Sequence, residues 1–494
     1  MNKNPGTKTL GYNEPLIFDR SRPGRSAVSI PTLDVPEVSA KSVFPKNLVR
    51  SKSAALPELS EPEVVRHFTR LSTWNFSVDH GFYPLGSCTM KYNPKINEWA
   101  SRLPGFANLH PYAPVHFSQG AIALIYELEA MLAEISGMAG VSLQPAAGAH
   151  GELTALMTIR KALINRGNPR KKVLIPDTAH GTNPASSNLN GYLVDSVSST
   201  KDGLLDPKSV AEKMDEDVAA LMLTNPNTVG LFEKHIQEIA EIVHSKGGFI
   251  FGDGANMNAI MGKARPGDFG VDAMQFNLHK TFSTPHGGGG PGSGPIGVCE
   301  ELVDYLPTPR PVKLDDNTFS LSCDFPKSIG RVRSFVGNFG IMVRAYTYLR
   351  ELGADGLKQA SEMAVLNANY LSALIKDHYH IPYGNGRCMH EVVASDRDLL
   401  KETNVSTLDV AKGLIDRGFH PPTVYFPLIV KGALMCEPTE TESKETIEEF
   451  ANAMIEIAEL AKTDPEILQT SPHNTRLGRL DETAAARKPV LKAD

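Results

Sequence analysis

Residues 277–295, NLHKTFSTPHGGGGPGSGP, carry the most informative signal for the fold of this 494-residue chain. The apolar run AMQFNL (273–278) predicts a short buried strand, and His279 and Lys280 follow directly after it. Threonine and serine hydroxyls and a run of glycines come next. A lysine that faces such a loop is either a reactive amine or an ordinary surface residue, and the surrounding segments must decide between the two.

Short apolar stretches alternate with helical patterns before Lys280. The expected strands are VLIP (173–176), ALMLTN (220–225) and GFIFGD (248–253). Amphipathic helices are expected over 120–137, 152–167 and 232–248. Strands that alternate with helices in this way predict an α/β fold, in which a mostly parallel sheet is covered on both faces.

Four regions are expected along the chain. Residues 1–70 form an N-terminal arm and a first helix, 71–335 a large α/β domain, 336–470 a smaller C-terminal α+β domain, and 471–494 a polar tail. The arm is rich in proline, serine and charge, which is compatible with disorder. Its apolar segments PLIF and SVFP favour an extended arm that lies either on its own subunit or on a neighbouring subunit.

Local signals place further helices and strands in these regions. Ser60 and Glu63 form a capping box at the start of the first helix, whose expected apolar face is Val64, Val65, Phe68 and Leu71. In the smaller domain, helices are expected over 337–353, 357–375 and 442–462. Strands are expected there at HEVVAS (390–395) and YFPLIV (425–430).

Composition argues against several kinds of function. The net charge of −6 gives no electrostatic basis for binding nucleic acid, and no apolar run approaches the roughly 20 residues of a membrane helix. A disulfide framework or a structural zinc site is not expected, because the five cysteines are scattered along the chain. They are Cys88, Cys299, Cys323, Cys388 and Cys436. The N-terminus lacks the apolar core of a secretory signal, so we expect a cytoplasmic protein.

Four segments fall at expected strand ends or loops, where ligands bind in open α/β sheets. They are QPAAGAHGE (144–152), PDTAHGTNPAS (176–186), GDGANMNA (252–259) and NLHKTFSTPHGGGG (277–290). In the first segment, Ala147, Gly148 and Ala149 leave backbone N–H groups open at a helix N-terminus, where a phosphate binds well. An ordinary loop with a helix cap is the alternative.

The next two segments carry side chains suited to a flat, charged ring. His180 would lie at the end of a strand, where it could stack on such a ring or move protons; a hydrogen-bonded loop histidine is the alternative. Asp253 ends a buried strand and needs a partner, such as a protonated pyridine nitrogen; a helix-capping role is the alternative. Together with Lys280, these residues predict that pyridoxal phosphate (PLP) is held as a Schiff base and acts as an electron sink.

The glycine run at 287–290, with Gly292 and Gly294, invites comparison with a nucleotide-binding loop. It is not a Walker A motif, because no GK[ST] follows. Pro291 and Pro295 also interrupt any GxGxxG pattern. We expect a tight loop beside a planar cofactor, and a flexible surface lid is the alternative.

Seven motifs, spread over nearly the whole chain, resemble the P-proteins, the PLP-dependent glycine decarboxylases of the glycine cleavage system. They are GSCTMKYNPK (86–95), HPYAP (110–114), GAHGE (148–152), AHGTNPAS (179–186), DGANMNA (253–259), NLHKTF (277–282) and EPTETESKE (437–445). The chain is similar in length to the second, or beta, subunit of the two-subunit form, and it is similar to the C-terminal half of the longer single-chain members.

The resemblance implies PLP-dependent transferase fold type I and gives a role to the matching residues. Lys280 would be the Schiff-base lysine, Asp253 would pair with the ring nitrogen, and His180 would stack on the ring and take part in catalysis. The remaining contacts with the cofactor, including those with its phosphate, would come from Ala147, Gly148, Ala149, Ala255 and Thr281.

The resemblance also implies a reaction and partners. Glycine would displace Lys280 from the cofactor and lose CO2, and its aminomethyl group would pass to the lipoyl disulfide of the H-protein. Such a reaction is that of an oxidoreductase, and an alpha subunit would complete an α2β2 assembly. The motifs at 86–95 and 110–114 would line the entrance for the lipoyl arm.

Cys88 is expected to be structural, and Arg387 is one candidate for binding the glycine carboxylate.

Two other functions are compatible with parts of this pattern. Another fold type I enzyme, such as an aminotransferase or an amino acid decarboxylase, would need no lipoyl channel. A non-catalytic partner of an active paralogue would need neither Asp253 nor Lys280, so the presence of both residues argues against that alternative.

Overall fold

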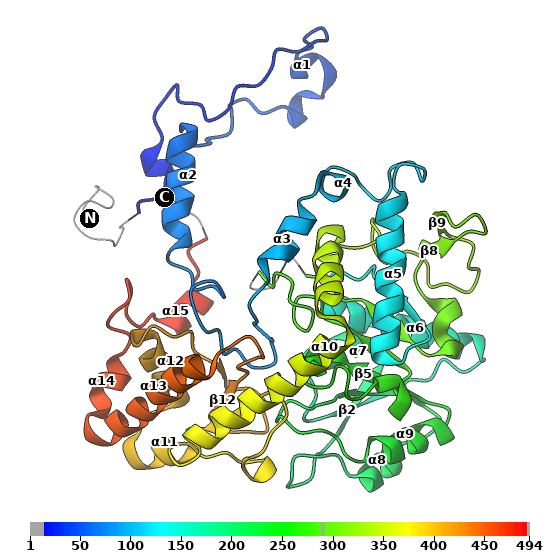
Figure 1. Cartoon of the computed structure of the whole chain (residues 1–494). Coiled ribbons are helices and arrows are strands. Elements are labelled where there is room, and N and C mark those ends of the chain that lie inside the picture. The colour runs from blue at the N-terminus through cyan, green and yellow to red at the C-terminus, as the bar shows by residue number, and fades with distance from the viewer. Residues whose placement is uncertain (1–13, 288–289, 291, 492–494) are drawn as a thin grey trace. The chain divides into compact units, whose positions relative to one another are not determined.

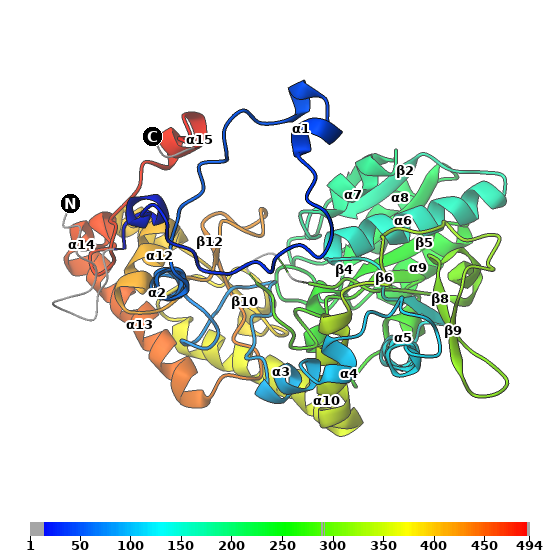
Figure 2. The same ribbon diagram turned by 90° about the horizontal axis from the view of Figure 1, so that it is seen from above.

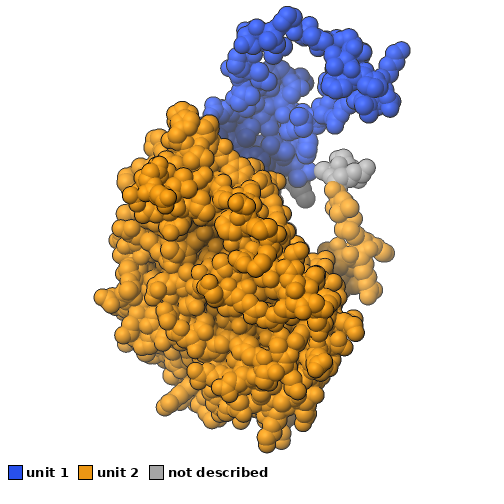
Figure 3. All heavy atoms as spheres, turned by 90° about the vertical axis from the view of Figure 1, so that its right-hand side faces the viewer, with its two compact units in different colours: residues 1–80 blue, residues 81–494 orange. Residues whose placement is uncertain are grey.

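The structure is a computed structural model, and it describes residues 14–287, 290 and 292–491. The chain separates into two compact units, residues 1–80 and 81–494 (Figure 3). This division does not test the domain boundaries expected near residues 70, 335 and 470, which stay predictions.

The first unit contains one longer helix and several short ones. The short helices are η1 (Ile17–Arg20), α1 (Ala40–Val43) and η2 (Lys46–Leu48), and the longer one is α2 (Glu61–Ser72). The expected capping box is confirmed, because the backbone N–H of Ser60 donates to the Glu63 carboxylate at 2.9 Å. Val65 and Phe68 are exposed, so the apolar face expected on α2 is only partly buried.

A seven-stranded sheet forms the centre of the second unit. In spatial order its strands are β1 (Gly140–Ser142), β7 (Ile296–Val298), β6 (Ala273–Gln275), β5 (Phe249–Asp253), β4 (Val218–Thr224), β2 (Lys172–Pro176) and β3 (Leu193–Val197). Strand β7 runs opposite to the other six strands, which all share one direction. The mostly parallel sheet and the four strands expected within it, β2, β4, β5 and β6, are therefore confirmed.

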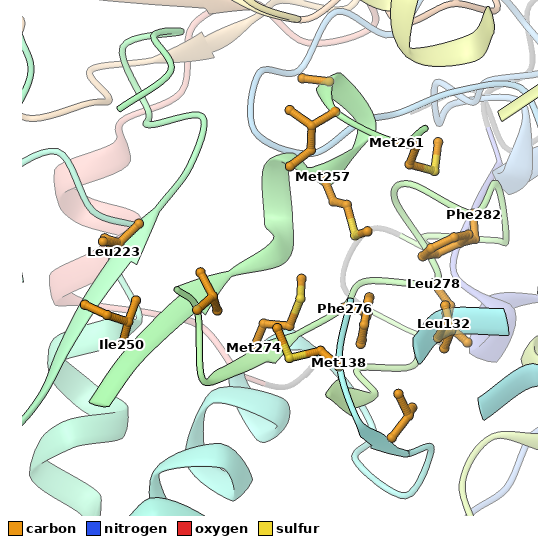
Figure 4. Close-up of a cluster of buried hydrophobic side chains, with 14 of the residues drawn as sticks. Leu132, Met138, Leu223, Ile250, Met257, Met261, Met274, Phe276, Leu278 and Phe282 are labelled. Carbon is orange, nitrogen blue, oxygen red and sulfur yellow. The ribbon is translucent and has the colours of Figure 1, made fainter. Parts of the chain in front are cut away.

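Helices cover both faces of this sheet, as the sequence predicts. One face packs against α6 (Gly148–Asn165) and α7 (Asn183–Leu189), and the other against α5 (Gln119–Ser136), α8 (Pro207–Lys213) and α9 (Ile236–Ser245) (Figures 1 and 2). Alternate residues of β4 point to opposite faces: Leu221 and Leu223 join one apolar cluster, while Ala220 and Met222 join the other. Figure 4 shows Leu223 and Ile250 in the first cluster.

Shorter elements connect the sheet to the rest of this unit. They are α3 (Lys95–Ser101), α4 (Pro104–Ala107), η3 (Gly254–Ala259), η4 (Pro266–Phe269), η5 (Glu300–Tyr305) and the hairpin of β8 (Arg310–Lys313) and β9 (Phe319–Ser322). Helix α5 ends at Gly137, which adopts φ 71° and so closes the helix in the left-handed conformation that glycine favours.

The C-terminal part of the second unit holds a second, smaller sheet. Its antiparallel strands are β10 (Val392–Ser395), β12 (Ala433–Cys436) and β11 (Thr423–Val424). The helices around it are α10 (Phe339–Ile375), η6 (Gly384–Gly386), α11 (Arg397–Thr403), α12 (Thr407–Asp416), α13 (Lys444–Thr463), α14 (Pro465–Thr470) and α15 (Glu482–Arg487). The two helices expected over 337–353 and 357–375 are confirmed: they are the two parts of α10, which meet in a kink at Gly353, where the backbone is not helical (Figure 1).

One expected strand is wrong. YFPLIV (425–430) forms a turn, and the strand that pairs with β10 is β12, a few residues later. Pro427 has no backbone N–H to donate to a sheet, and Tyr425 has a left-handed φ of 57°. Apolar content alone therefore suggested a strand where the backbone could not form one.

No helix among the described residues is both long enough and apolar enough to cross a membrane.

Leu221→Ala should test how strongly the large sheet stabilises the chain. Leu221 is fully buried in β4, so its truncation leaves a cavity and should lower the free energy of unfolding by about 2–5 kcal/mol. Urea-induced unfolding of the full chain measures this change. The control, Leu189→Ala on the exposed surface of α7, should change the same quantity by less than about 0.5 kcal/mol. Equal losses of unfolding free energy in the two variants would contradict the burial of Leu221 in the sheet.

Candidate active site

A cavity of about 460 Å³ lies where the strands β5 and β6 and the helix α6 meet. Seven of the eight residues expected to form the site line it: Ala147, Gly148, Ala149, His180, Asp253, Ala255 and Lys280. The other lining residues are Ala146, Glu152, Thr182, Gln275, Asn277, His279, His286, Gly290, Gly292 and Asn338. The four segments singled out in the sequence thus contribute to one cavity.

The N-terminus of α6 opens on this cavity without a side-chain cap. Ala147 is the N-cap residue and has no side chain that could accept a hydrogen bond from the first turn. The first N–H groups of a helix have no partner within the helix, so they remain available to an anion. A side chain at Gly148 would collide with Asn277, because a Cβ there would lie 2.5 Å from its Oδ1.

Asp253 presents one free carboxylate oxygen. Its side chain is 3% exposed, and Oδ1 accepts hydrogen bonds from the backbone N–H of Ala255 at 2.9 Å and from the Gln275 amide. Its second oxygen, Oδ2, is buried and has no hydrogen-bond partner within the described part of the chain. A buried carboxylate oxygen without a partner is costly, so this atom points to a donor that the protein itself does not supply.

Lys280 lies on a turn that apolar side chains hold in place. Phe276, Leu278 and Phe282, on either side of it, are fully buried and lie in one cluster (Figure 4). The Lys280 side chain itself is 8% exposed, and its Nζ donates to the backbone carbonyl of Ser87 at 2.7 Å. The lysine is therefore a buried amine at a cavity, and the alternative of a surface residue is wrong.

His180 is half-buried at the rim of the same cavity. Its Nδ1 lies 3.1 Å from the Thr182 hydroxyl, and its backbone N–H donates to Thr224. Burial lowers the pKa of His180 and the charge of Lys280 lowers it further, although Asp253 raises it. The imidazole is therefore neutral at neutral pH, the form that can stack on a ring or accept a proton.

Glu152 is a member of this site that sequence analysis missed. It is 2% exposed, and it accepts hydrogen bonds from the hydroxyls of Thr182 and Ser186. Burial raises its pKa to about 8, with the nearby charge of Asp253 as the second cause. Its position four residues after Gly148, on the same face of α6, is the signal that could have found it.

Thr281, the eighth expected site residue, and Arg387, the separate candidate for the glycine carboxylate, lie outside the lining. Thr281 is fully buried, and its Oγ1 has no hydrogen-bond partner among the described residues. Arg387 is exposed, so the candidate for binding the glycine carboxylate does not reach the cavity. Arg333 is closer, since it donates at 2.8 Å to Asn338, one of the lining residues.

The glycine loop after Lys280 is described only in part, because residues 288, 289 and 291 lie outside the described residues. A Cβ at Gly294 would lie 2.0 Å from the Ala147 carbonyl oxygen, and one at Gly292 would lie 2.8 Å from Nδ1 of His279. These two glycines therefore permit close packing of the loop against the start of α6 and against the lysine turn, as a packing loop requires.

Cys88 is half-buried, and burial raises the pKa of its thiol. An uncharged thiol is a poor nucleophile, so this environment supports the interpretation of Cys88 as structural.

Comparison with known proteins identifies the family. The family model described as "Glycine cleavage system P-protein" matches residues 31–311, more than half of the chain, and that of "Glycine dehydrogenase, C-terminal domain" matches residues 360–473. The chain belongs to the glycine cleavage system P-protein family.

Curated relatives in this family match the chain along nearly its full length. The probable glycine dehydrogenase (decarboxylating) subunit 2 of Listeria innocua is 57% identical over 479 residues, which cover 97% of this chain and 98% of the relative. The protein of the same description from Caldanaerobacter subterraneus is 56% identical over 482 residues, or 97% and 99% of the two chains. The resemblance to the P-protein family is thereby confirmed.

Solved structures show the same fold at low sequence identity. A crystal structure of glycine decarboxylase (P-protein) in inhibitor-bound form superposes with a TM-score of 0.72 at 20% identity, over 84% of this chain and 93% of that one. An aspartate aminotransferase from Thermus thermophilus gives a TM-score of 0.53 at 14% identity, over 76% and 97%. The chain therefore has the PLP-dependent transferase fold type I that the resemblance to the P-protein family implies.

Glu152 should make stability fall as the pH rises. The pKa of Glu152 is raised in the folded chain. Its contribution to the stability of the folded chain is therefore fully present below its ordinary pKa of 4.5 and is lost as the pH rises through about 8. Glu152→Gln cannot ionise, so at about pH 9 the variant should be more stable than the wild type by about 1 kcal/mol or more, and this difference should vanish at about pH 5. Melting temperatures of the cofactor-free protein measure this. The exposed control Glu241→Gln should show no such pH dependence, and parallel curves for Glu152→Gln and wild type would contradict the prediction.

Proposed function

We propose that this chain is the PLP-binding subunit 2 of a glycine dehydrogenase (decarboxylating), which removes CO2 from glycine in the glycine cleavage system. Sequence identity of 56–57% to relatives of that description, over 97% of this chain, supports the reaction. The observation that carries the cofactor assignment is the buried Oδ2 of Asp253, which lacks a hydrogen-bond partner among the described residues and belongs to the same cavity as Lys280. A protonated pyridine nitrogen is the donor that would satisfy this oxygen.

The residues present fit PLP at both ends of the molecule. Lys280 offers a buried amine for the covalent link, and Asp253 offers a carboxylate oxygen that would keep the ring nitrogen protonated. The open N-terminus of α6, from Ala147 to Ala149, would bind the phosphate. We assign the Thr281 hydroxyl to the phosphate as well, since it is buried without a partner in the described residues. When bound, PLP supplies an electron sink for the negative charge left after CO2 is lost.

The protein side chains around this cavity would control protons and water. His180 is neutral and lies at the rim, so we assign it to the face of the ring, where it can also accept or donate a proton. Ala255 fixes Asp253 through its backbone N–H and lines the cavity with its methyl group. Protonated Glu152 adds no charge beside Asp253, and its hydrogen bonds to Thr182 and Ser186 hold the segment that carries His180.

The second half of the reaction needs partners. We propose that the aminomethyl group passes to the lipoyl disulfide of an H-protein, with reduction of the disulfide, and that a subunit 1 completes an α2β2 enzyme. The description of the relatives as subunit 2 supports a partner subunit. All five cysteines are free, which favours a reducing compartment, and we place the enzyme in the cytoplasm.

Borohydride reduction of the PLP-loaded protein, followed by peptide mapping, is expected to find a phosphopyridoxyl group on Lys280. The reason is that Lys280 is the lysine among the residues lining the cavity. Lys280→Ala should abolish the label. Lys91 is also buried, but Glu440 holds its Nζ in an ion pair at 2.6 Å, so it should stay unlabelled. A label on Lys91, or none on either residue, would refute the site.

Glycine-dependent exchange of CO2 should require this chain, subunit 1 and lipoylated H-protein together. Asp253→Asn should lower the exchange rate by about 10²–10³-fold, because a neutral amide cannot hold the ring nitrogen protonated. Asp268→Asn, at an exposed position of η4, is the matched control and should leave the rate unchanged. Full activity in Asp253→Asn would argue against its role, and full exchange by this chain alone would argue against a two-subunit enzyme.

A further inference from the structure

The loop GSCTMK (86–91) has an unusual backbone and lies against Lys280. Ser87 and Thr89 are not glycines, yet both adopt the left-handed region, with φ 61° and 46°. Residues in this conformation persist only where the surrounding structure fixes them. The carbonyl of Ser87 accepts the hydrogen bond from the Lys280 amine. The question is therefore what holds this loop in place.

Two buried glutamates hold it. Oε2 of Glu391 accepts from the backbone N–H of Ser87 at 2.7 Å, and Oε2 of Glu437 accepts from the backbone N–H of Thr89 at 2.8 Å. Both glutamates are fully buried, and neither lines the cavity beside Lys280. Asn256 adds a further link, because its amide donates to the Glu391 carboxylate and its oxygen accepts from the Ser87 hydroxyl.

The smaller sheet explains why these two carboxyl groups are neighbours. Strands β10 and β12 are antiparallel, with Val392 paired to Cys436. Glu391 precedes the first strand and Glu437 follows the second, so they are the next opposed positions of the same ladder. Opposed positions lie on the same face of a sheet, and like charges there repel. An oxygen of each glutamate and a ring nitrogen of His390 all lie within 4.8 Å of one another.

The surroundings disfavour a second negative charge on the pair. Burial raises the pKa of Glu437 to about 7 and raises that of Glu391 well above its usual value, and the charge of Glu437 is the second cause for Glu391. His390 does not compensate, because burial lowers its pKa to about 3. The other titratable groups around the pair are Lys280, Lys91 and the thiols of Cys88 and Cys388.

We propose that Glu391 and Glu437 are positioning residues that together retain one proton and fix the loop 86–91. Through the Ser87 carbonyl they orient the amine of Lys280 whenever that amine is free. The inference deepens the proposed function, because it rests on Lys280 as the reactive lysine. It extends the active site to a second sheet whose glutamates touch neither substrate nor cofactor.

The proposal predicts that the loop loosens at alkaline pH. Both carboxyl groups have raised pKa values, so their contribution to stability is complete below about 4.5 and is lost as the pH rises through about 7 and beyond. A second negative charge in the buried pair then weakens the hold on Ser87 and Thr89. Glu437→Gln keeps an acceptor for the Thr89 N–H but leaves only one ionisable group, so it should remove this pH dependence.

Hydrogen exchange in the peptide that covers residues 86–91 tests directly whether the two glutamates fix this loop, and it can be measured with or without PLP. Glu391→Ala and Glu437→Ala should each speed exchange there by about tenfold or more at neutral pH, relative to intrinsic rates. Glu437→Gln should match the wild type at neutral pH and stay protected at alkaline pH. The control is Glu442→Gln, in the same segment but without a bond from its carboxylate to the loop. Unchanged exchange in both alanine variants would overturn the proposal.

Uptake of PLP by the cofactor-free protein, followed by absorbance, tests the link to Lys280. At alkaline pH, Glu437→Gln should take up PLP about tenfold faster than the wild type, and the two rates should agree at neutral pH. If the uptake rates of Glu437→Gln and the wild type depend on pH in the same way, the role of the glutamates in orienting Lys280 is overturned, even if hydrogen exchange in the loop changes. No uptake by the wild type would refute Lys280 as the reactive amine, which the exchange experiment does not depend on. One metal ion per chain that is lost in Glu437→Gln would also overturn the proposal, since a cation would then balance the two glutamates.

Discussion

The burial of several carboxyl groups around one lysine is the constraint on which the rest of the structure depends. Asp253, Glu152, Glu391 and Glu437 are each at most 3% exposed. Burial raises the pKa of the three glutamates, and the positive charge of Lys280 opposes that rise in each of them. Because a buried charge is tolerated only when it is balanced or neutralised, protons and hydrogen-bond donors must be placed accurately around this lysine.

The parallel sheet provides much of that accuracy. Strands β5 and β6 are neighbours, with Asp253 paired to Gln275, so the carboxylate and the lysine turn lie at the same edge. Gln275 also donates to Asp253, which means that the strand leading to the lysine fixes the carboxylate. The smaller sheet then approaches from residues more than 100 positions later in the chain, through Glu391 and Glu437. Two sheets thus determine the surroundings of one amine.

Patterns within short segments predicted much of this arrangement. The strands at 220–225 and 248–253 were found because each is a continuous apolar run that ends in a polar residue, which is what a strand buried on both faces produces. The same criterion failed at 425–430, where Pro427 prevents pairing. It also gave no hint of Glu391 and Glu437, because nothing in either segment shows that the other will lie opposite it. Contacts between distant segments depend on the register of strands that local sequence does not fix.

Two buried carboxylate oxygens in this region, each without a hydrogen-bond partner among the described residues, call for different partners, although the same rule applies to both. Oδ2 of Asp253 belongs to a residue that lines the cavity, so a ligand from outside the chain can reach it. Oε1 of Glu437 is equally buried and also lacks a hydrogen-bond partner in the described residues, but Glu437 does not line the cavity. Its nearest titratable neighbours are Glu391 and the neutral ring of His390. In the proposed function the first oxygen therefore accepts a hydrogen bond from a bound cofactor, whereas in the proposed glutamate pair the second belongs to a group whose charge is limited by a retained proton.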